Sequence, residues 1–168
     1  MTLDRLWAGW RSAYIDEVAT QQPRDDACLF CELLEANEKE ALVLARNDLV
    51  FAVLNAYPYT SGHLMVAPVR HVGALSALSR EEAAALMLMT QDATVALERA
   101  YTPDGVNIGA NLGRAAGAGI PGHVHLHALP RWVGDTNFMT TIAEARVLPE
   151  PLSTSWEKLK AAWPATDA

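Results

Sequence analysis

The chain has 168 residues, of which 51% are hydrophobic and 20% charged, and this composition excludes a disordered or low-complexity protein. Its formal net charge of −7 argues against nonspecific binding to nucleic acid, although it leaves room for a local phosphate site. The chain lacks both the roughly 18 consecutive apolar residues of a membrane span and the apolar core of a signal peptide. We therefore expect a single cytoplasmic domain over residues 1–168.

The predicted elements begin with a short docking helix over residues 3–14, where apolar residues recur at intervals of three and four. A polar segment without periodicity follows over residues 16–27 and is expected to form a loop. Two Val-rich runs, 41–46 and 49–54, flank an Asn-Asp pair and predict a hairpin. A third strand is expected over residues 63–68, which a proline closes.

The longest predicted element is a helix over about residues 79–101, which has a serine cap, two first-turn glutamates and strong helix formers. Strands are expected over residues 105–111 and 123–129, with a Gly/Ala loop over 113–122 between them. A final helix is expected over about residues 152–163. Strands around one long helix predict an α+β domain with a mostly antiparallel sheet.

Three of the five histidines alternate with aliphatic residues in one run, His123-Val124-His125-Leu126-His127-Ala128-Leu129. Because successive side chains of a strand point to opposite faces, the three imidazoles would share one face and line a surface or cleft. The aliphatic residues would then face the core. A half-exposed strand that happens to carry histidine is the plain alternative, but a strand does not require imidazole. Neutral imidazoles in a row suit metal ligation or nucleophilic catalysis.

The loop before this run combines glycines with one arginine, in the order Gly113-Arg114-Ala115-Ala116-Gly117-Ala118-Gly119. Glycine permits turns in which backbone N–H groups face an anion, so Gly117 and Gly119 are candidate phosphate contacts. Arg114 is a candidate cation for the same phosphate. Asn111, at the loop entrance, offers a neutral amide to an oxyanion or a hydroxyl. An ordinary turn is the alternative for each of these residues.

Cys28 and Cys31 form a Cys-x-x-Cys motif, which occurs in redox pairs and zinc sites and also by chance. The sequence around the pair has no thioredoxin-like βαβ pattern, which disfavours a redox role. The motif alone does not decide between the remaining alternatives.

The segment from His123 to Pro130 resembles the signature of the histidine triad (HIT) superfamily of nucleotide hydrolases and transferases. Asn55 ahead of Pro58, the run Gly62-His63-Leu64-Met65-Val66-Ala67-Pro68 and the pair Arg70-His71 resemble the upstream block of that family. The flanks at residues 6–11, 54–59 and 130–139 resemble its bacterial diadenosine tetraphosphate phosphorylase branch. The resemblance implies a HIT-like fold with a motif core over about residues 28–139, in a homodimer or a dimer of dimers.

The resemblance also implies a mechanism in which His125 attacks the α-phosphate of an adenine dinucleoside polyphosphate and forms a nucleotidyl-histidine. His127 would hydrogen-bond the phosphate oxygens, and His123 would complete the triad. Inorganic phosphate as acceptor gives phosphorolysis, which the branch favours, and water gives hydrolysis. Hydrolysis of phosphoramidates, transfer to a sugar phosphate and a zinc-stabilised nucleotide-binding module with little catalysis are the alternatives.

Further residues receive roles from the same resemblance. Asn55 matches a residue that holds ribose hydroxyls, and Asn111 matches a polar residue near the transferred phosphate. His63 is expected behind the triad, and Trp132 is a candidate contact to base or phosphate. Many relatives carry a polar side chain shortly before the triad, whereas residues 117–122 here have no hydroxyl or amide side chain, so backbone N–H groups would take over.

Zinc-containing HIT proteins use a cysteine pair, the histidine after the Gly-His strand and the first triad histidine as ligands. All four positions are present here as Cys28, Cys31, His71 and His123. A closed shell of four protein ligands leaves no position for water, so the resemblance implies a structural zinc ion.

Overall fold

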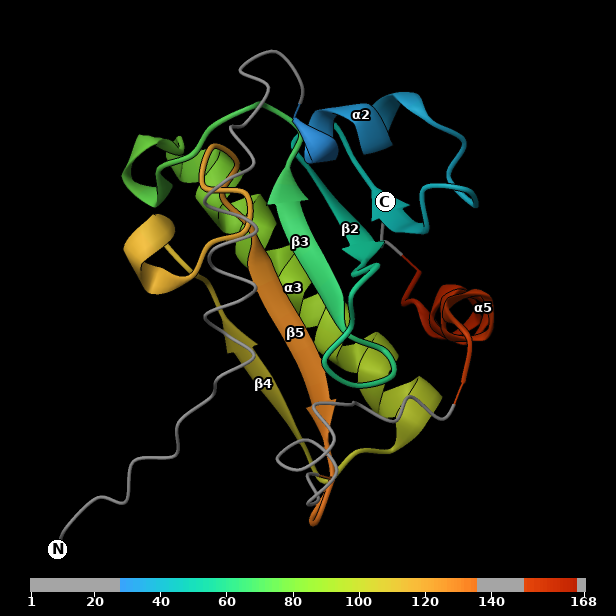
Figure 1. Ribbon diagram of the computed structural model, residues 1–168. Coiled ribbons are helices and arrows are strands. Elements are labelled where there is room, and N and C mark those ends of the chain that lie inside the picture. Colours follow the sequence, from blue (N-terminus) through green and yellow to red (C-terminus); the bar gives the residue numbers. More distant parts are fainter. Residues whose placement is uncertain (1–27, 136–149, 166–168) are drawn as a thin grey trace, which may run out of the picture.

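The computed structural model describes residues 28–135 and 150–165. Five strands form one antiparallel sheet in the order β1-β2-β3-β5-β4, so β5 lies between β3 and the edge strand β4 (Figure 1). The strands are β1 Val43–Arg46, β2 Val50–Leu54, β3 Leu64–Pro68, β4 Gly105–Gly109 and β5 Leu126–Arg131. The predicted α+β class and antiparallel sheet are confirmed.

The long predicted helix is α3, Arg80–Tyr101, and it covers one face of the sheet (Figure 1). A capping box starts it, because the Ser79 hydroxyl accepts from the Glu82 N–H while the Glu82 carboxylate accepts from the Ser79 N–H. Its buried residues pack with alternate residues of β2 and β3 into the main core. This packing fixes the sheet on which the histidines are carried.

The turn between β1 and β2 follows from one side chain. Oδ1 of Asn47 accepts hydrogen bonds from the backbone N–H groups of Leu49 and Val50, both at 2.9 Å. The predicted hairpin is therefore confirmed, with β1 starting two residues later than expected. Both strands reach the face of the sheet opposite α3 as well as the core.

The strand that contains the histidines begins later than its sequence pattern predicts. His123 and Val124 precede β5, since the His123 N–H bonds Ile120 O in a turn and the Val124 N–H bonds Val72 O. The strand then continues through Pro130, which was expected to end it. Pro130 lies beyond Ala128, the last residue of β5 that pairs with β3, so its missing N–H breaks no bond to β3.

A short helix that the sequence interpretation missed, α2 at Leu29–Glu35, lies near one end of β2 and β3 (Figure 1). Phe30 is fully buried and packs with Val43, Phe51 and Met65 in a second apolar cluster. This cluster covers the sheet face opposite α3. The sheet is therefore buried on both faces near the histidines.

The C-terminal helix is α5, Leu152–Ala162, close to the predicted range. Nε1–H of Trp156 donates to Val43 O at 2.9 Å, which holds α5 against β1. Two short 3-10 turns, η1 at Leu75–Ala77 and η2 at Arg114–Ala116, interrupt the connecting loops. None of the described helices is both long and apolar enough to cross a membrane. The docking helix predicted over residues 3–14 lies outside the described residues, and the single domain over 1–168 stays a prediction.

Candidate active site

The protonation state of His125 is fixed by a backbone carbonyl. Nδ1 of His125 lies 2.8 Å from the carbonyl oxygen of His123. Because a carbonyl only accepts, Nδ1 carries the hydrogen and donates it, and in the neutral ring Nε2 holds the lone pair. Burial lowers the pKa of His125, which keeps the ring neutral near pH 7. The structure thus leaves a nitrogen lone pair on Nε2 of a neutral His125.

His63 and His127 form a hydrogen-bonded pair with a defined direction. Nδ1 of His63 accepts the backbone N–H of Tyr59 at 3.1 Å, and the amide nitrogen of Asn55 lies 3.3 Å from the same atom. His63 therefore donates through Nε2 to Nδ1 of His127 at 2.9 Å. Since Nδ1 of neutral His127 accepts, its Nε2 carries a hydrogen and is a donor.

The neutral state of His127 follows from its surroundings. Burial, with a smaller contribution from the neighbouring His125 ring, lowers the pKa of His127 to about 4. The centroids of these two rings are 4.9 Å apart, in an edge-to-face arrangement. A ring nitrogen with a lone pair and a ring N–H donor therefore lie side by side, a combination suited to nucleophilic attack at phosphorus.

The histidines lie deeper than a strand face that lines an open surface would place them. His63 and His123 are fully buried and His125 nearly so, whereas His127 is half-buried. Phe30 of α2 covers two of them, since its ring centroid is 5.1 Å from that of His123 and 4.8 Å from that of His125. This cover was not predicted, because α2 was not.

Four further ligand atoms meet at the start of α2. The Sγ atoms of Cys28 and Cys31 and ring nitrogens of His71 and His123 all lie within 4.8 Å of one another. Nδ1 of His123 is 3.3 Å from Cys28 Sγ and 3.9 Å from Cys31 Sγ, and Nδ1 of His71 is 3.5 Å from Cys31 Sγ. Tetrahedral zinc with ordinary Zn–S and Zn–N bonds separates sulfur and nitrogen by about 3.5 Å. The donor set and its spacing therefore fit zinc.

The tautomer of His123 also suits a ligand. Its Nε2 lies 2.8 Å from the carbonyl oxygen of Pro68, at the end of β3, and so carries the hydrogen. Nδ1 is then left with the lone pair that points at the two sulfur atoms. Nε2 thus donates to a carbonyl while Nδ1 is available as a ligand to a metal ion shared with the two cysteines.

Several backbone N–H groups of the Gly/Ala loop form hydrogen bonds within the loop itself. The N–H groups of Ala116, Gly117 and Ala118 donate to carbonyls within residues 113–114, and Gly117 adopts a φ of 88°. Asn111 donates its side-chain N–H to Gly117 O at 3.3 Å. The structure thus uses the Gly117 N–H inside the turn rather than offering it to a ligand. Arg114 and Gly119 are both exposed.

Asn55 and Trp132, the two remaining candidates for nucleotide contacts, lie in different parts of the structure. Oδ1 of Asn55 accepts the backbone N–H of Tyr57 at 2.9 Å, so Asn55 is a turn residue as well as a neighbour of His63. Trp132 contacts the ring of Tyr101 from α3, edge to face, with centroids 6.2 Å apart. Trp132 directly follows the last residue of β5. A role for it in nucleotide binding stays a prediction.

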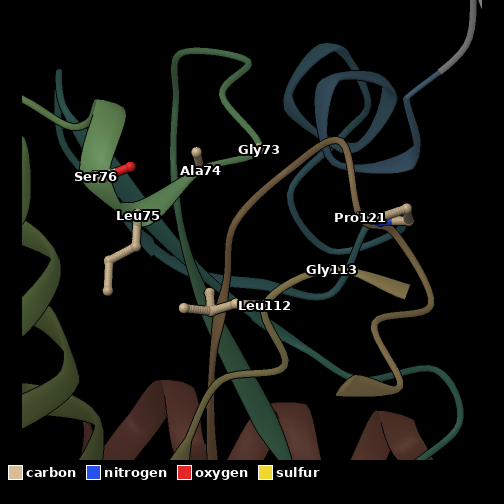
Figure 2. A pocket seen from close by; sticks show the side chains of 7 residues that line it. All are labelled: Gly73, Ala74, Leu75, Ser76, Leu112, Gly113 and Pro121. Carbon is tan, nitrogen blue, oxygen red and sulfur yellow. The ribbon is translucent and has the colours of Figure 1, made fainter. Parts of the chain in front are cut away.

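A cavity of about 660 Å³ opens beside the Gly/Ala loop (Figure 2). Gly113 and Pro121 line it from that loop, with Leu112 beside them, and Leu75 and Ser76 line it from η1. Gly73 packs so close to Pro121 that a Cβ on it would lie 2.8 Å from Pro121 O. None of the histidines lines this cavity, so it is separate from the histidine cluster.

A model of the HIT domain matches residues 36–133, more than half of the chain. The chain belongs to the HIT family. The described strands and the long helix α3 form the α+β fold that its structural relatives share.

The HIT relatives are close in sequence as well as in fold. The AP-4-A phosphorylase of Mycobacterium tuberculosis is 40% identical over 165 residues, which cover 96% of this chain and 85% of the relative. The crystal structure of a Zn-bound histidine triad family protein from Mycobacterium smegmatis superposes with a TM-score of 0.66 and 28% identity, covering 81% of this chain and 92% of that one. A protein from Sulfolobus tokodaii, described as a hypothetical histidine triad nucleotide-binding protein, matches in fold, with a TM-score of 0.66 and 23% identity, over 80% of this chain and 91% of that one.

Two residues of this HIT protein's site escaped the sequence interpretation. Phe30 has a sequence signal, because Phe30, Leu33 and Leu34 follow the spacing of one helix face. Tyr59 lies in the 54–59 flank that resembles the family, but no local pattern predicts its contact with His63, which depends on how a loop folds back. The four zinc-ligand candidates implied by the family resemblance come together, as does the His125–His127 pair expected from the strand alternation.

Proposed function

We propose that this chain cleaves dinucleoside polyphosphates of the diadenosine tetraphosphate type by phosphorolysis, through a nucleotidyl-His125 intermediate. The observation that carries the proposal is the hydrogen bond from His125 Nδ1 to His123 O, which leaves Nε2 as the nucleophile. The relative named AP-4-A phosphorylase, 40% identical over nearly the whole chain, supports the substrate class and the acceptor.

The reaction divides into two displacements at the α-phosphorus. Nε2 of His125 forms a bond to phosphorus, the P–O bond to the distal part of the substrate breaks, and diadenosine tetraphosphate releases ATP. An oxygen of inorganic phosphate then attacks the same phosphorus, the P–N bond breaks, and ADP leaves with the nucleophile restored. Water in place of phosphate would give AMP.

His127 is the proposed donor to the non-bridging phosphate oxygens. Its Nε2–H is oriented by the hydrogen bond that Nδ1 accepts from His63. Charge on these oxygens increases in the transition state, and a donor held in place beforehand stabilises it more than the ground state. His63 acts behind His127, as a residue that positions the donor.

The polyphosphate and ribose are assigned to residues around this pair. We place the ribose hydroxyls at Asn55 and the phosphates near Asn111, Arg114 and Gly119. Asn111 ties the loop through Gly117 O, so it orders the loop even where it does not touch substrate. Arg114 supplies an exposed positive charge in a protein whose net charge is −7.

We propose that Cys28, Cys31, His71 and His123 hold a structural zinc ion. The donor set is that of a closed tetrahedral site, and the ion would tie α2 to the start of the triad segment. A solved relative described as Zn-bound supports the choice of metal. A homodimer or dimer of dimers and a cytoplasmic location stay predictions of the family resemblance.

The test is product analysis with diadenosine tetraphosphate, with and without inorganic phosphate. The proposal predicts that ATP and ADP are the products and that they form at a measurable rate only when inorganic phosphate is present. AMP and ATP at the same rate with or without phosphate would replace phosphorolysis by hydrolysis. No turnover and no adduct, with nucleotide still bound, would favour the nucleotide-binding module.

A further inference from the structure

The ring of Tyr59 packs directly on the pair of histidines that presents the phosphate donor. Its centroid is 4.7 Å from that of His63, with a tilt of 36°, and 6.3 Å from that of His127, with a tilt of 24°. The backbone N–H of the same residue donates to Nδ1 of His63 at 3.1 Å. One residue thus contacts the pair through both its side chain and its main chain.

The loop that carries Tyr59 is held to the strands on both sides. The Asn55 N–H donates to His63 O at 3.0 Å, and the His63 N–H donates to Thr60 O at 3.1 Å. The Thr60 hydroxyl donates to Pro130 O at 3.3 Å, three residues past His127 on β5. The Tyr59 ring is therefore carried by a backbone segment that is anchored on either side of it.

The direction of the His63–His127 hydrogen bond depends on the absence of competing water. Water both donates and accepts, so a molecule at either nitrogen of His63 would let the ring exchange its tautomer. His63 is fully buried, and the Tyr59 ring covers it while remaining 49% exposed itself. Because the ring is both packed on His63 and partly exposed, its removal would open a path for water to the pair.

We propose that Tyr59 is a positioning residue, whose ring and backbone N–H together hold His63 in the tautomer that makes His127 donate through Nε2. That the Nε2–H of His127 donates to a substrate phosphate rests on the proposed function. The tautomers themselves are a property of the free protein. The proposed role uses the ring and the backbone N–H of Tyr59, both of which a phenylalanine retains.

Tyr57 provides a matched control in the same loop. Its side chain is 86% exposed, and its backbone N–H, which any residue but proline retains, makes the bond to Asn55. Tyr57→Ala therefore removes an equal side chain from the loop without uncovering His63. Differences between the alanine variants at 57 and 59 report the contact with the histidines and not a general effect on the loop.

The kinetic test compares Tyr59→Ala, Tyr59→Phe and Tyr57→Ala with the wild type. We expect kcat to fall between about tenfold and about a hundredfold in Tyr59→Ala, the loss that a misplaced catalytic group causes, while KM changes less than about threefold. Tyr59→Phe and Tyr57→Ala should stay within about twofold of wild type, a variation below what the loss of a positioned group costs. An unchanged kcat in Tyr59→Ala, or an equal loss in Tyr59→Phe, would overturn the proposal.

A second readout needs no substrate. Long-range ¹⁵N NMR of the free wild type should show His63 and His127 as single Nε2–H tautomers, and Tyr59→Ala should show exchange at both. Single unchanged tautomers in Tyr59→Ala would contradict the proposal, whatever the enzyme does. If the wild type turns over no dinucleoside polyphosphate while the tautomers still respond, the proposed function fails and the role of Tyr59 stands. Tyr59→Val, whose small side chain leaves most of the His63 ring uncovered, serves in the same way if the alanine variant does not fold.

Discussion

The backbone carbonyl of His123 accepts the Nδ1 hydrogen of His125 at 2.8 Å, while the ring of the same His123 belongs to the Cys₂His₂ cluster. One residue therefore connects the candidate zinc site to the nucleophile. Its ring is fixed at Nε2 by Pro68 O and would be fixed at Nδ1 by the metal. Loss of the metal ligands should therefore shift the backbone carbonyl of His123 and, through it, the orientation of the His125 ring.

Replacement of a zinc ligand tests this connection. Cys31→Ser should reduce zinc from about one equivalent per chain to less than about half an equivalent, because serine does not replace a thiolate. The Tm should fall by roughly 10 °C, as expected when a structural metal contributes several kcal/mol to folding. Elemental analysis and thermal unfolding measure both quantities. Glu35→Gln, an exposed change in the same helix, is the control, and full zinc in Cys31→Ser would refute the ligand set.

The long helix and the sheet were predictable because their signals are local. Ser79 and Glu82 are a capping box in sequence and in structure, and the hairpin turn is specified by one asparagine, Asn47. The alternation around His125 likewise predicted which residues meet. These features depend on neighbours within a few positions along the chain.

The remaining features depend on contacts between distant segments. The triad was expected in a strand from its first histidine, but His123 lies outside the ladder because its own N–H bonds Ile120 O and the N–H of Val124 bonds Val72 O. The contact of Phe30 with His123 and the geometry of the cluster both require α2 to pack against His123, although Cys31 of α2 is 92 residues from His123 in sequence. Periodicity has no information about such contacts, whereas the family resemblance supplied the ligand set.

The hydrogen bond from His63 to His127 gives a second prediction. His63→Leu should lower kcat by about a hundredfold, since Nδ1 of His127 loses its donor and the ring is free to reverse its tautomer. His63→Gln retains an amide N–H and should recover part of the loss. Steady-state kinetics at saturating phosphate measure the effect. Equal activity in the leucine variant and the wild type would show that His127 does not depend on His63.

The ion pair between Arg70 and Glu82 predicts a pH-dependent stability. Hydrogen bonds from Arg70, at 2.7 and 2.8 Å, and from the Ser79 N–H lower the pKa of Glu82 from 4.5 to about 2. Because the pKa is lower in the folded chain, the stabilisation is complete above about pH 4.5 and is lost as the pH falls through about 2.

Urea unfolding of the wild type, Glu82→Gln and Glu81→Gln tests this sign. The difference in free energy of unfolding between wild type and Glu82→Gln should be constant from about pH 7 to pH 5 and shrink at lower pH. Glu81→Gln, in the same helical turn but exposed, should show little of this dependence. A difference that grows as the pH falls would contradict the depressed pKa.

Arg114 gives a prediction about substrate binding. Arg114→Ala should raise KM for diadenosine tetraphosphate by about fivefold at low ionic strength, with kcat little changed, because an exposed charge–phosphate contact is worth about 1 kcal/mol. The effect should diminish as salt is added. Arg80→Ala removes an exposed arginine at the start of α3 and is the control. A salt-independent loss of kcat would assign Arg114 a different role.

The measurement that tests the account most directly is a mass spectrum of the protein after brief exposure to diadenosine tetraphosphate without phosphate. The account predicts an adduct with the mass of one adenylate on His125, which disappears with formation of ADP when inorganic phosphate is added. His125→Ala should form no adduct and lose at least about 10³-fold in turnover. A His125→Ala variant that keeps full turnover, or an adduct on another residue, would contradict it.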